Sequence, residues 1–164
     1  MMVGQASYAI QDGIYILKFR GDIRFHLCAS VDRFIQRIFQ ETVKPKVIID
    51  LLEATAVDST ALGVIAQIAI HTRRAYDHRP TILVRNPDLL AVLNAVSFNK
   101  VFHILPDAEH EPESYRELES EPADEIQFTR QALLAHRHLM ALSHENRMLF
   151  QDVTRALESV AHLH

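Results

Sequence analysis

Two hydroxyl side chains behind a carboxylate are the residues of this sequence best suited to act as a chemical switch. They are Ser59 and Thr60, which directly follow Asp58. A phosphate added at the start of a helix would meet unsatisfied backbone N–H groups and the positive end of the helix dipole. Because the same short side chains are good helix caps, a phosphorylation site and a simple helix start are both open interpretations.

The elements that position these hydroxyls can be predicted from the pattern of apolar residues. Residues 46–52 are β-branched and apolar, which predicts a buried strand. Apolar residues then recur at helical spacing over residues 59–76. Further strands are predicted at 7–10, 14–19, 81–84 and 101–105, and further helices at 25–41 and from Pro87. Strands alternating with helices predict an α/β fold.

The sequence Asp58-Ser59-Thr60-Ala61-Leu62-Gly63 resembles the Asp-Ser-Ser/Thr-Gly-Leu-Gly signature of STAS domains, specifically of bacterial anti-sigma factor antagonists. The resemblance covers roughly residues 8–106, including a strand, helix and terminal strand that close the domain. It implies a STAS-like mixed β-sheet packed by helices. One departure is Ala61 in place of the usual Gly, which suits the first turn of a helix.

The resemblance also implies a function that is not enzymatic. In this family a partner kinase, the anti-sigma factor, phosphorylates a hydroxyl of the motif. The unphosphorylated protein binds that partner, and a PP2C-like phosphatase restores the binding form. By this resemblance the chain is an anti-sigma factor antagonist with Ser59 as the acceptor and Thr60 as the alternative.

A set of partner-binding residues follows from the same resemblance. Its members are Asp22, Arg24, Asp58, Ser59, Thr60 and Leu62. The family usually has an acidic residue where this chain has Arg24. That arginine either forms a charge-assisted pair with a phosphoserine or is a solvated surface cation.

Composition and motifs argue against several other classes of protein. The net charge of −4 comes without a Lys/Arg block, which does not favour nucleic-acid binding. No P-loop, dinucleotide fingerprint or Gly-x-Ser-x-Gly elbow appears, so we expect no enzyme activity and no cofactor. The ten histidines lack the spacing of a zinc site, so no metal is expected. No polar constellation favours a small-molecule sensor.

Targeting signals and cysteine usage predict a soluble, cytoplasmic protein. The N-terminus lacks the features of a signal peptide, and no apolar run approaches the roughly 20 residues that span a bilayer. The single cysteine, Cys28, rules out an internal disulfide and falls in a helical apolar pattern, so we expect a buried thiol.

The composition divides the chain into three parts. Residues 1–106 form the predicted STAS domain, residues 107–125 an acidic, extended linker, and residues 126–164 an amphipathic helix without Pro or Gly. Apolar residues of this helix follow a heptad pattern, with Asn146 in the seam. The seam consists of Phe128, Ala132, Ala135, Leu139, Leu142, Asn146, Leu149, Val153, Ala156, Val160 and Leu163.

The heptad seam predicts binding by the C-terminal helix, without fixing the partner. Leu139, Leu142, Asn146, Leu149 and Val153 are its predicted central contacts. The helix would form a homo-oligomeric coiled coil, bind a partner helix, or pack back onto its own domain. The alternative function is therefore a non-switching STAS scaffold or oligomerisation module, in which Ser59 is only a helix cap.

Overall fold

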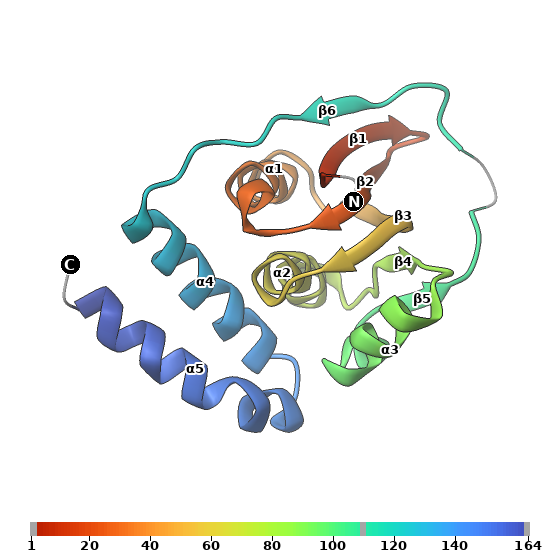
Figure 1. The fold of residues 1–164 in the computed structure, drawn as a ribbon. Coiled ribbons are helices and arrows are strands. Elements are labelled where there is room, and N and C mark those ends of the chain that lie inside the picture. The colour runs from red at the N-terminus through yellow and green to blue at the C-terminus, as the bar shows by residue number, and fades with distance from the viewer. Residues whose placement is uncertain (1–2, 109–110, 163–164) are drawn as a thin grey trace.

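Within residues 3–108 and 111–162, which the computed structural model describes, six strands form one mixed sheet (Figure 1). Their order is β5-β4-β3-β2-β1-β6. The neighbours β2, β3, β4 and β5 run parallel, whereas β1 is antiparallel to both β2 and β6. The strands are β1 (Gln5–Gln11), β2 (Ile14–Ile23), β3 (Lys46–Val57), β4 (Thr81–Leu83), β5 (His103–Leu105) and β6 (Arg116–Leu118).

The first two strands form the predicted hairpin. Asp12 and Gly13 both have positive φ, at 54° and 79°, as a two-residue hairpin turn requires. Glycine adopts this conformation at no steric cost, and aspartate tolerates it better than most residues. The turn fixes the register in which Gln11 pairs with Ile14.

Helices pack on the sheet as the alternating pattern predicts. α1 and α2 lie side by side against it, with α3 near the β4–β5 edge (Figure 1). α1 is amphipathic and buries Val31, Phe34, Ile35 and Ile38. The helices are α1 (Cys28–Glu41), α2 (Ser59–Tyr76), α3 (Pro87–Ala95), α4 (Glu125–Met140) and α5 (His144–His162), with short 3₁₀ turns at Phe25–Leu27 and Phe98–Lys100.

The acidic segment crosses from one edge of the sheet to the other. It leaves β5, adds β6 beside β1 and then reaches α4 (Figure 1). A salt bridge between Arg33 of α1 and Glu121 holds its far end. Glu109, one of its acidic residues, lies outside the described residues. Part of this acidic segment, Arg116–Leu118, thus belongs to the sheet, and we call residues 106–124 the strap.

The C-terminal extension is helical, as predicted, but it is a hairpin of two helices. The prediction of one uninterrupted helix over 126–164 is wrong because Ser143 starts a second helix. Its hydroxyl accepts a hydrogen bond from the Asn146 backbone N–H at 3.0 Å, which satisfies a donor that a helix start leaves free. Leu163, the last seam residue, lies outside the described residues.

The hairpin packs back onto its own domain. α4 contacts α2 along its length and α5 packs on α4 (Figure 1). The two backbones meet closely at Gly63, where an added Cβ would collide with the carbonyl oxygen of Ala135. At the other end, the Asn146 amide donates to the backbone oxygens of Val96 and Leu139 at 2.7 and 2.8 Å. Of the three arrangements that the seam allowed, the chain adopts packing onto its own domain.

Candidate functional site

The motif around Ser59 lies at the carboxyl ends of two adjacent parallel strands. β2 and β3 pair as far as Ile23 and Val57, and the Asp58 backbone N–H donates to the Ile23 carbonyl at 2.9 Å. The chain then turns into α2, whose first residue is Ser59. This pairing brings the predicted partner-binding residues at 22–24 next to those at 58–59.

Asp58 is the residue that caps α2. One carboxylate oxygen accepts from the Ala61 N–H at 2.8 Å, and the other accepts from the Phe25 N–H at 3.0 Å. Ser59 is the first residue inside the helix, so the alternative in which Ser59 serves as the cap is wrong. The cap position leaves the Ser59 hydroxyl free for another contact.

That contact comes from the C-terminal hairpin. The Ser59 Oγ lies 2.9 Å from Nε2 of His136, a residue of α4 that is 77 positions away in the chain. The imidazole is only 6% exposed and stacks on Phe150 of α5. Ser59 itself is half-buried. The predicted switch residue is therefore covered by the chain's own C-terminal helices.

The protonation of His136 follows from its burial. Desolvation lowers the pKa of His136 below its usual value, while the negative charge of Asp58 raises it in part, so the ring is neutral near pH 7. Its Nδ1 is buried and has no hydrogen-bond partner among the described residues. Because an orphaned buried N–H is rare, we place the proton on Nε2, from which it is donated to Ser59.

This Ser59–His136 pair differs from the arrangement that activates a serine nucleophile. Activation requires the histidine to accept the serine proton while a third group orients the ring through its other nitrogen. His136 donates to the serine, and none of the described residues bonds its Nδ1. The pair can hold the hydroxyl in place, but it lacks the machinery to make it a nucleophile.

Two of the predicted site residues are buried. Thr60 is 6% exposed and Leu62 is 3% exposed, with Leu62 in the main hydrophobic core. In this conformation Leu62 does not reach the surface, so its predicted direct contact with a partner is not available. Of the two candidate acceptors, only Ser59 has a partly exposed side chain.

Asp22 and Arg24 form an ion pair beside the motif. The Arg24 Nε donates to an Asp22 carboxylate oxygen at 2.7 Å, and the arginine side chain is otherwise well exposed. This hydrogen bond with Asp22 raises the pKa of Arg24, and the charge of Asp58 adds to the effect. Arg24 therefore lies within electrostatic reach of the motif, while its hydrogen bond goes to Asp22.

The predicted seam residues of the C-terminal segment divide into two groups. Leu139, Leu142 and Asn146 are buried in contacts within the chain, whereas Leu149 and Val153 are exposed on α5. Asn146 bonds to its own domain and is not the coiled-coil register residue that the heptad suggested. The first group is thus used inside the molecule and the second is not.

Sequence reasoning missed two residues of the site, His136 and Gly63. No local signal links His136 to Ser59, because the contact depends on how a distant helix packs. Gly63 did carry a signal, since it is the glycine that closes the motif. A glycine within a helix lowers helix stability, and the close approach of α4 explains its presence there.

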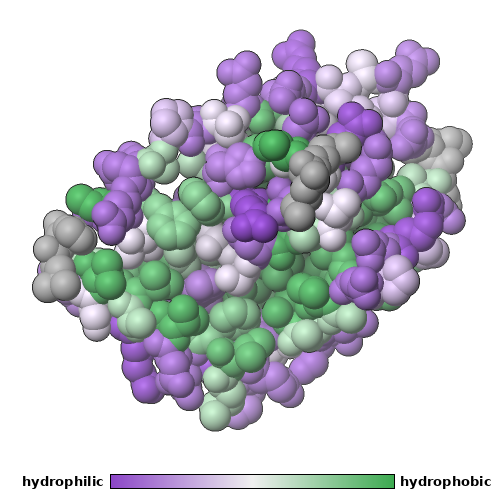
Figure 2. Space-filling view, in the orientation of Figure 1, coloured by the Kyte–Doolittle hydropathy of each residue, from purple (hydrophilic) through white to green (hydrophobic). Residues whose placement is uncertain are grey.

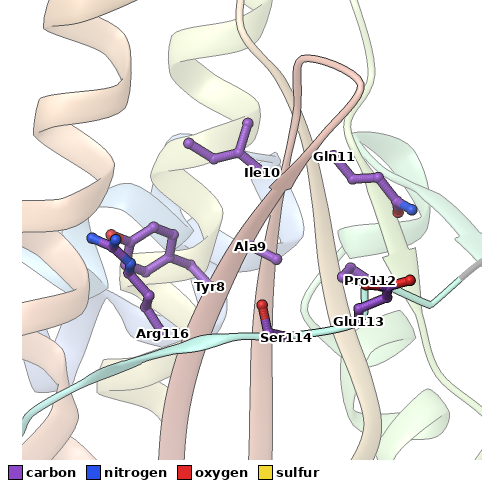
Figure 3. A pocket seen from close by; sticks show the side chains of 8 residues that line it. All are labelled: Tyr8, Ala9, Ile10, Gln11, Pro112, Glu113, Ser114 and Arg116. Carbon is purple, nitrogen blue, oxygen red and sulfur yellow. The ribbon is translucent and has the colours of Figure 1, made fainter.

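Two of the surface hollows lie between the sheet and the strap. One, of about 450 Å³, lies between β1 and residues 112–116, where Tyr8 and Arg116 are side by side (Figure 3). The other, of about 260 Å³, lies between the sheet and the strap near Asp50 and Tyr115. Asp50 lies inside β3 and not at its end, and its carboxylate accepts a hydrogen bond from the Leu52 N–H at 2.9 Å.

Within residues 3–108 and 111–162, no three His, Cys, Asp or Glu side chains are grouped closely enough to hold a metal ion. In that same part of the chain, no helix is both long and apolar enough to cross a membrane.

Comparison with known proteins agrees with this fold. A family model described as the STAS domain matches residues 5–110, which is more than half of the chain and ends before α4. No curated protein matches the chain. A similar solved structure is described as a candidate anti-sigma factor antagonist from Thermotoga maritima, with 17% identity and a TM-score of 0.54. The match covers 62% of this chain and 86% of that one, and at this identity it concerns the fold. The predicted STAS-like fold is confirmed.

Proposed function

The chain belongs to the STAS domain family, and from this premise we propose that it is an anti-sigma factor antagonist switched by phosphorylation of Ser59. Unphosphorylated, it binds an anti-sigma factor that is also its serine kinase; a PP2C-like phosphatase reverses the modification. It acts in the cytoplasm as a binding protein, without catalysis of its own.

The observation that carries this proposal is that the Ser59 hydroxyl, at the start of α2, has no capping role. Asp58 performs the capping, so the Ser59 side chain is not needed to begin the helix. Its neighbour Thr60 is buried, which favours Ser59 as the acceptor. A hydroxyl placed at a helix N-terminus without a capping role is well suited to be modified.

The switch acts through charge. A phosphate on Ser59 adds roughly −1.5 to −2 charges at neutral pH, directly beside the Asp58 carboxylate. Both Asp58 carboxylate oxygens already accept from backbone N–H groups, so the side chain is held beside residue 59 and opposes the new charge. A contact surface that fits a neutral hydroxyl is thereby changed into a strongly acidic one.

The experiment is affinity capture from the cytoplasm of the native host with four full-length baits. They are the wild type, Ser59→Ala, Ser59→Asp and the control Ser114→Asp, which adds the same charge to an exposed serine of the strap. Bound proteins are identified by mass spectrometry. The captured kinase is then incubated with ATP and the wild-type chain to map the phosphorylated residue.

We expect one serine kinase to be captured by the wild type, by Ser59→Ala and by the control Ser114→Asp. The same kinase should not be captured by Ser59→Asp. Phosphate should appear on Ser59 and not on Thr60. A kinase bound equally by Ser59→Ala and Ser59→Asp would overturn the switch.

A second candidate function is a scaffold that assembles through α5. The observation that favours it is the row of exposed Leu149, Val153 and Val160 along one side of that helix. If this row forms an oligomer, the full chain should be larger than a monomer by light scattering, and Leu149→Glu with Val153→Glu should make it monomeric. A monomer in both cases would remove this function.

A further inference from the structure

The hydroxyl proposed as the switch is already occupied by the chain itself. His136 donates to Ser59 at 2.9 Å, and behind its ring lies Phe150 at a centroid distance of 5.4 Å. His136 is nearly fully buried, and Ser59 beside it is half-buried. An enzyme that transfers a phosphoryl group needs unobstructed access to the hydroxyl oxygen and to the space in line with it.

A phosphoserine does not fit beneath the docked α4. The direct hydrogen bond leaves no space between Ser59 and His136 for a phosphorus atom with three oxygens. The surroundings offer a phosphate no free positive charge beneath α4, since Asp58 is acidic, burial lowers the pKa of His136, and the nearby Arg24 donates to Asp22. Helix α4 must move away before Ser59 can be modified, and it cannot return while the phosphate remains.

The hairpin lies against the domain along α2, and specific contacts are present at both ends of this interface. Near Ser59, α4 lies directly against the Gly63 backbone, and any larger residue there would push the helix out. At the far end, Asn146 bonds to Val96 and Leu139, and the Ser143 hydroxyl lies 2.7 Å from that of Ser97. Residues 119–124, the part of the strap after β6, connect that strand to α4, so the hairpin can leave while β6 stays paired with β1 (Figure 1).

We propose that the α4–α5 hairpin is an autoinhibitory lock on Ser59. Docked, it withholds the serine both from a kinase and from a partner that recognises the start of α2. Undocked, it leaves Ser59 accessible to the kinase and the start of α2 accessible to the partner. A phosphate on Ser59 then keeps the hairpin undocked. The two states differ in whether residue 59 lies beneath α4, which is a measurable property of the protein alone.

The regulatory role of the lock rests on the proposed function, but the lock itself can be tested without a partner protein. Residue 59 is made a reporter by Ser59→Cys in a Cys28→Ala background, because Cys28 is the only native cysteine and is buried. The rate at which an aromatic disulfide reagent labels the full-length chain then reports how often residue 59 is uncovered. Val43→Cys, at a position that is 90% exposed, gives the rate of an uncovered site.

Two variants open the lock by different means, and a third is their control. Gly63→Val introduces a collision with Ala135, and His136→Ala removes the ring that covers residue 59. His144→Ala removes a histidine of the same hairpin that is exposed and distant from Ser59. Circular dichroism shows whether each variant is folded, and His136→Ala keeps the test decisive if Gly63→Val does not fold.

We expect residue 59 to be labelled at least about tenfold more slowly than the Val43→Cys reference, since labelling requires local opening. His136→Ala and Gly63→Val should each raise the rate toward the reference, and His144→Ala should not change it. Labelling of residue 59 at the reference rate without any opening variant would overturn the lock.

The effect of the phosphate is tested by hydrogen exchange on the full-length chain carrying phosphoserine at 59. We expect the amides of residues 132–139 to exchange faster than in the unmodified chain. Unchanged or slower exchange would mean that the phosphate fits under α4 and would overturn this part of the proposal. A chain that shows the lock but captures no kinase even when His136→Ala, which opens the lock, is the bait would contradict the proposed function while leaving the lock standing.

Discussion

The two helices of the C-terminal hairpin share one heptad pattern but use it differently. In and just after α4, Leu139 is fully buried and Leu142 is 7% exposed. In α5, Leu149 is 59% exposed and Val153 is 41% exposed, although both lie in the same seam. The pattern continues across the Ser143 turn, but after the buried Asn146 the seam residues of α5 are exposed.

The difference shows what a heptad pattern specifies. It identifies a face that is able to pack, but the neighbour that covers the face depends on the rest of the fold. The face of α4 meets α2, because Gly63 lets the two backbones approach closely. α5 lies on the outer side of α4, and its seam residues after Asn146 meet solvent. Figure 2 shows hydrophobic residues gathered in a band across the face drawn in Figure 1, with hydrophilic residues along the strap.

The largest expected difference between the two helices concerns Leu139 and Leu149. Leu139→Ala should lower the free energy of unfolding by about 2–5 kcal/mol, because it leaves a cavity in a fully packed site. Leu149→Ala, the same chemical change on the exposed seam, should stay within about 0.5 kcal/mol of the wild type. Urea unfolding followed by circular dichroism measures both. Equal losses would mean that α5 is also covered in solution.

A smaller effect is expected for Asn146, the polar residue that connects the helices to the domain. Asn146→Ala removes three side-chain hydrogen bonds: two that the amide donates to the buried carbonyls of Val96 and Leu139, and one that it accepts from the Ser97 hydroxyl. We expect a loss of about 1–3 kcal/mol. The control, Asn99→Ala, changes an exposed asparagine of the nearby 3₁₀ turn and should have little effect. The same unfolding assay applies, and a neutral Asn146→Ala would contradict the anchor.

The elements of the STAS domain could be predicted because their signals are local. Gln11-Asp12-Gly13 specifies its own turn, Pro87 suits the first turn of α3, and residues 46–52 are apolar enough to be a buried strand. The motif also predicted correctly that α2 begins at Ser59. Asp58 and Ser59 were not distinguished as cap and first helical residue, because both are good caps and only the backbone conformation decides between them.

The cover over Ser59 could not be predicted because it depends on contacts between distant residues. His136 had no pattern that tied it to residue 59, and Asn146 lies in a heptad position that usually faces another chain. The break after α4 did have a local signal in Ser143, but a lone serine is also common inside exposed helices. The absence of Pro and Gly from residues 126–164 therefore led to the prediction of one long helix, although a helix can also end without either residue.

The docking of α4 should depend on pH, with a modest effect. Burial lowers the pKa of His136 and of His138 below the ordinary value of 6.5, so the docked state holds both rings neutral. An undocked α4 returns them to about 6.5 and binds more protons below that pH. The stability of docking is thus fully present above about pH 6.5 and falls as the pH decreases toward the lowered pKa values.

The groups around the two rings do not remove this effect. Asp58 faces His136, and Asp32 faces His138; both raise the histidine pKa, but burial is the larger cause in each case. His71 and Arg74 of α2 act with burial on His138. Hydrogen exchange of residues 132–139 should therefore be faster at about pH 5.5 than at about pH 7.5, after correction for intrinsic rates. His136→Gln with His138→Gln should weaken this difference, and an unchanged difference would assign it to other groups.

The smallest expected effect on the unfolding free energy concerns the salt bridge between Arg137 of α4 and Glu158 of α5. The Arg137 guanidinium is 3.2 Å from the Glu158 carboxylate, and both side chains are largely exposed. An exposed ion pair is worth about 0–1 kcal/mol, since water screens it and two long side chains lose freedom. Arg137→Ala should thus change the unfolding free energy by less than Asn146→Ala, and the change should shrink further in high salt. A loss as large as that of Leu139→Ala would mean that surface charge, rather than the face buried against α2, holds the hairpin closed.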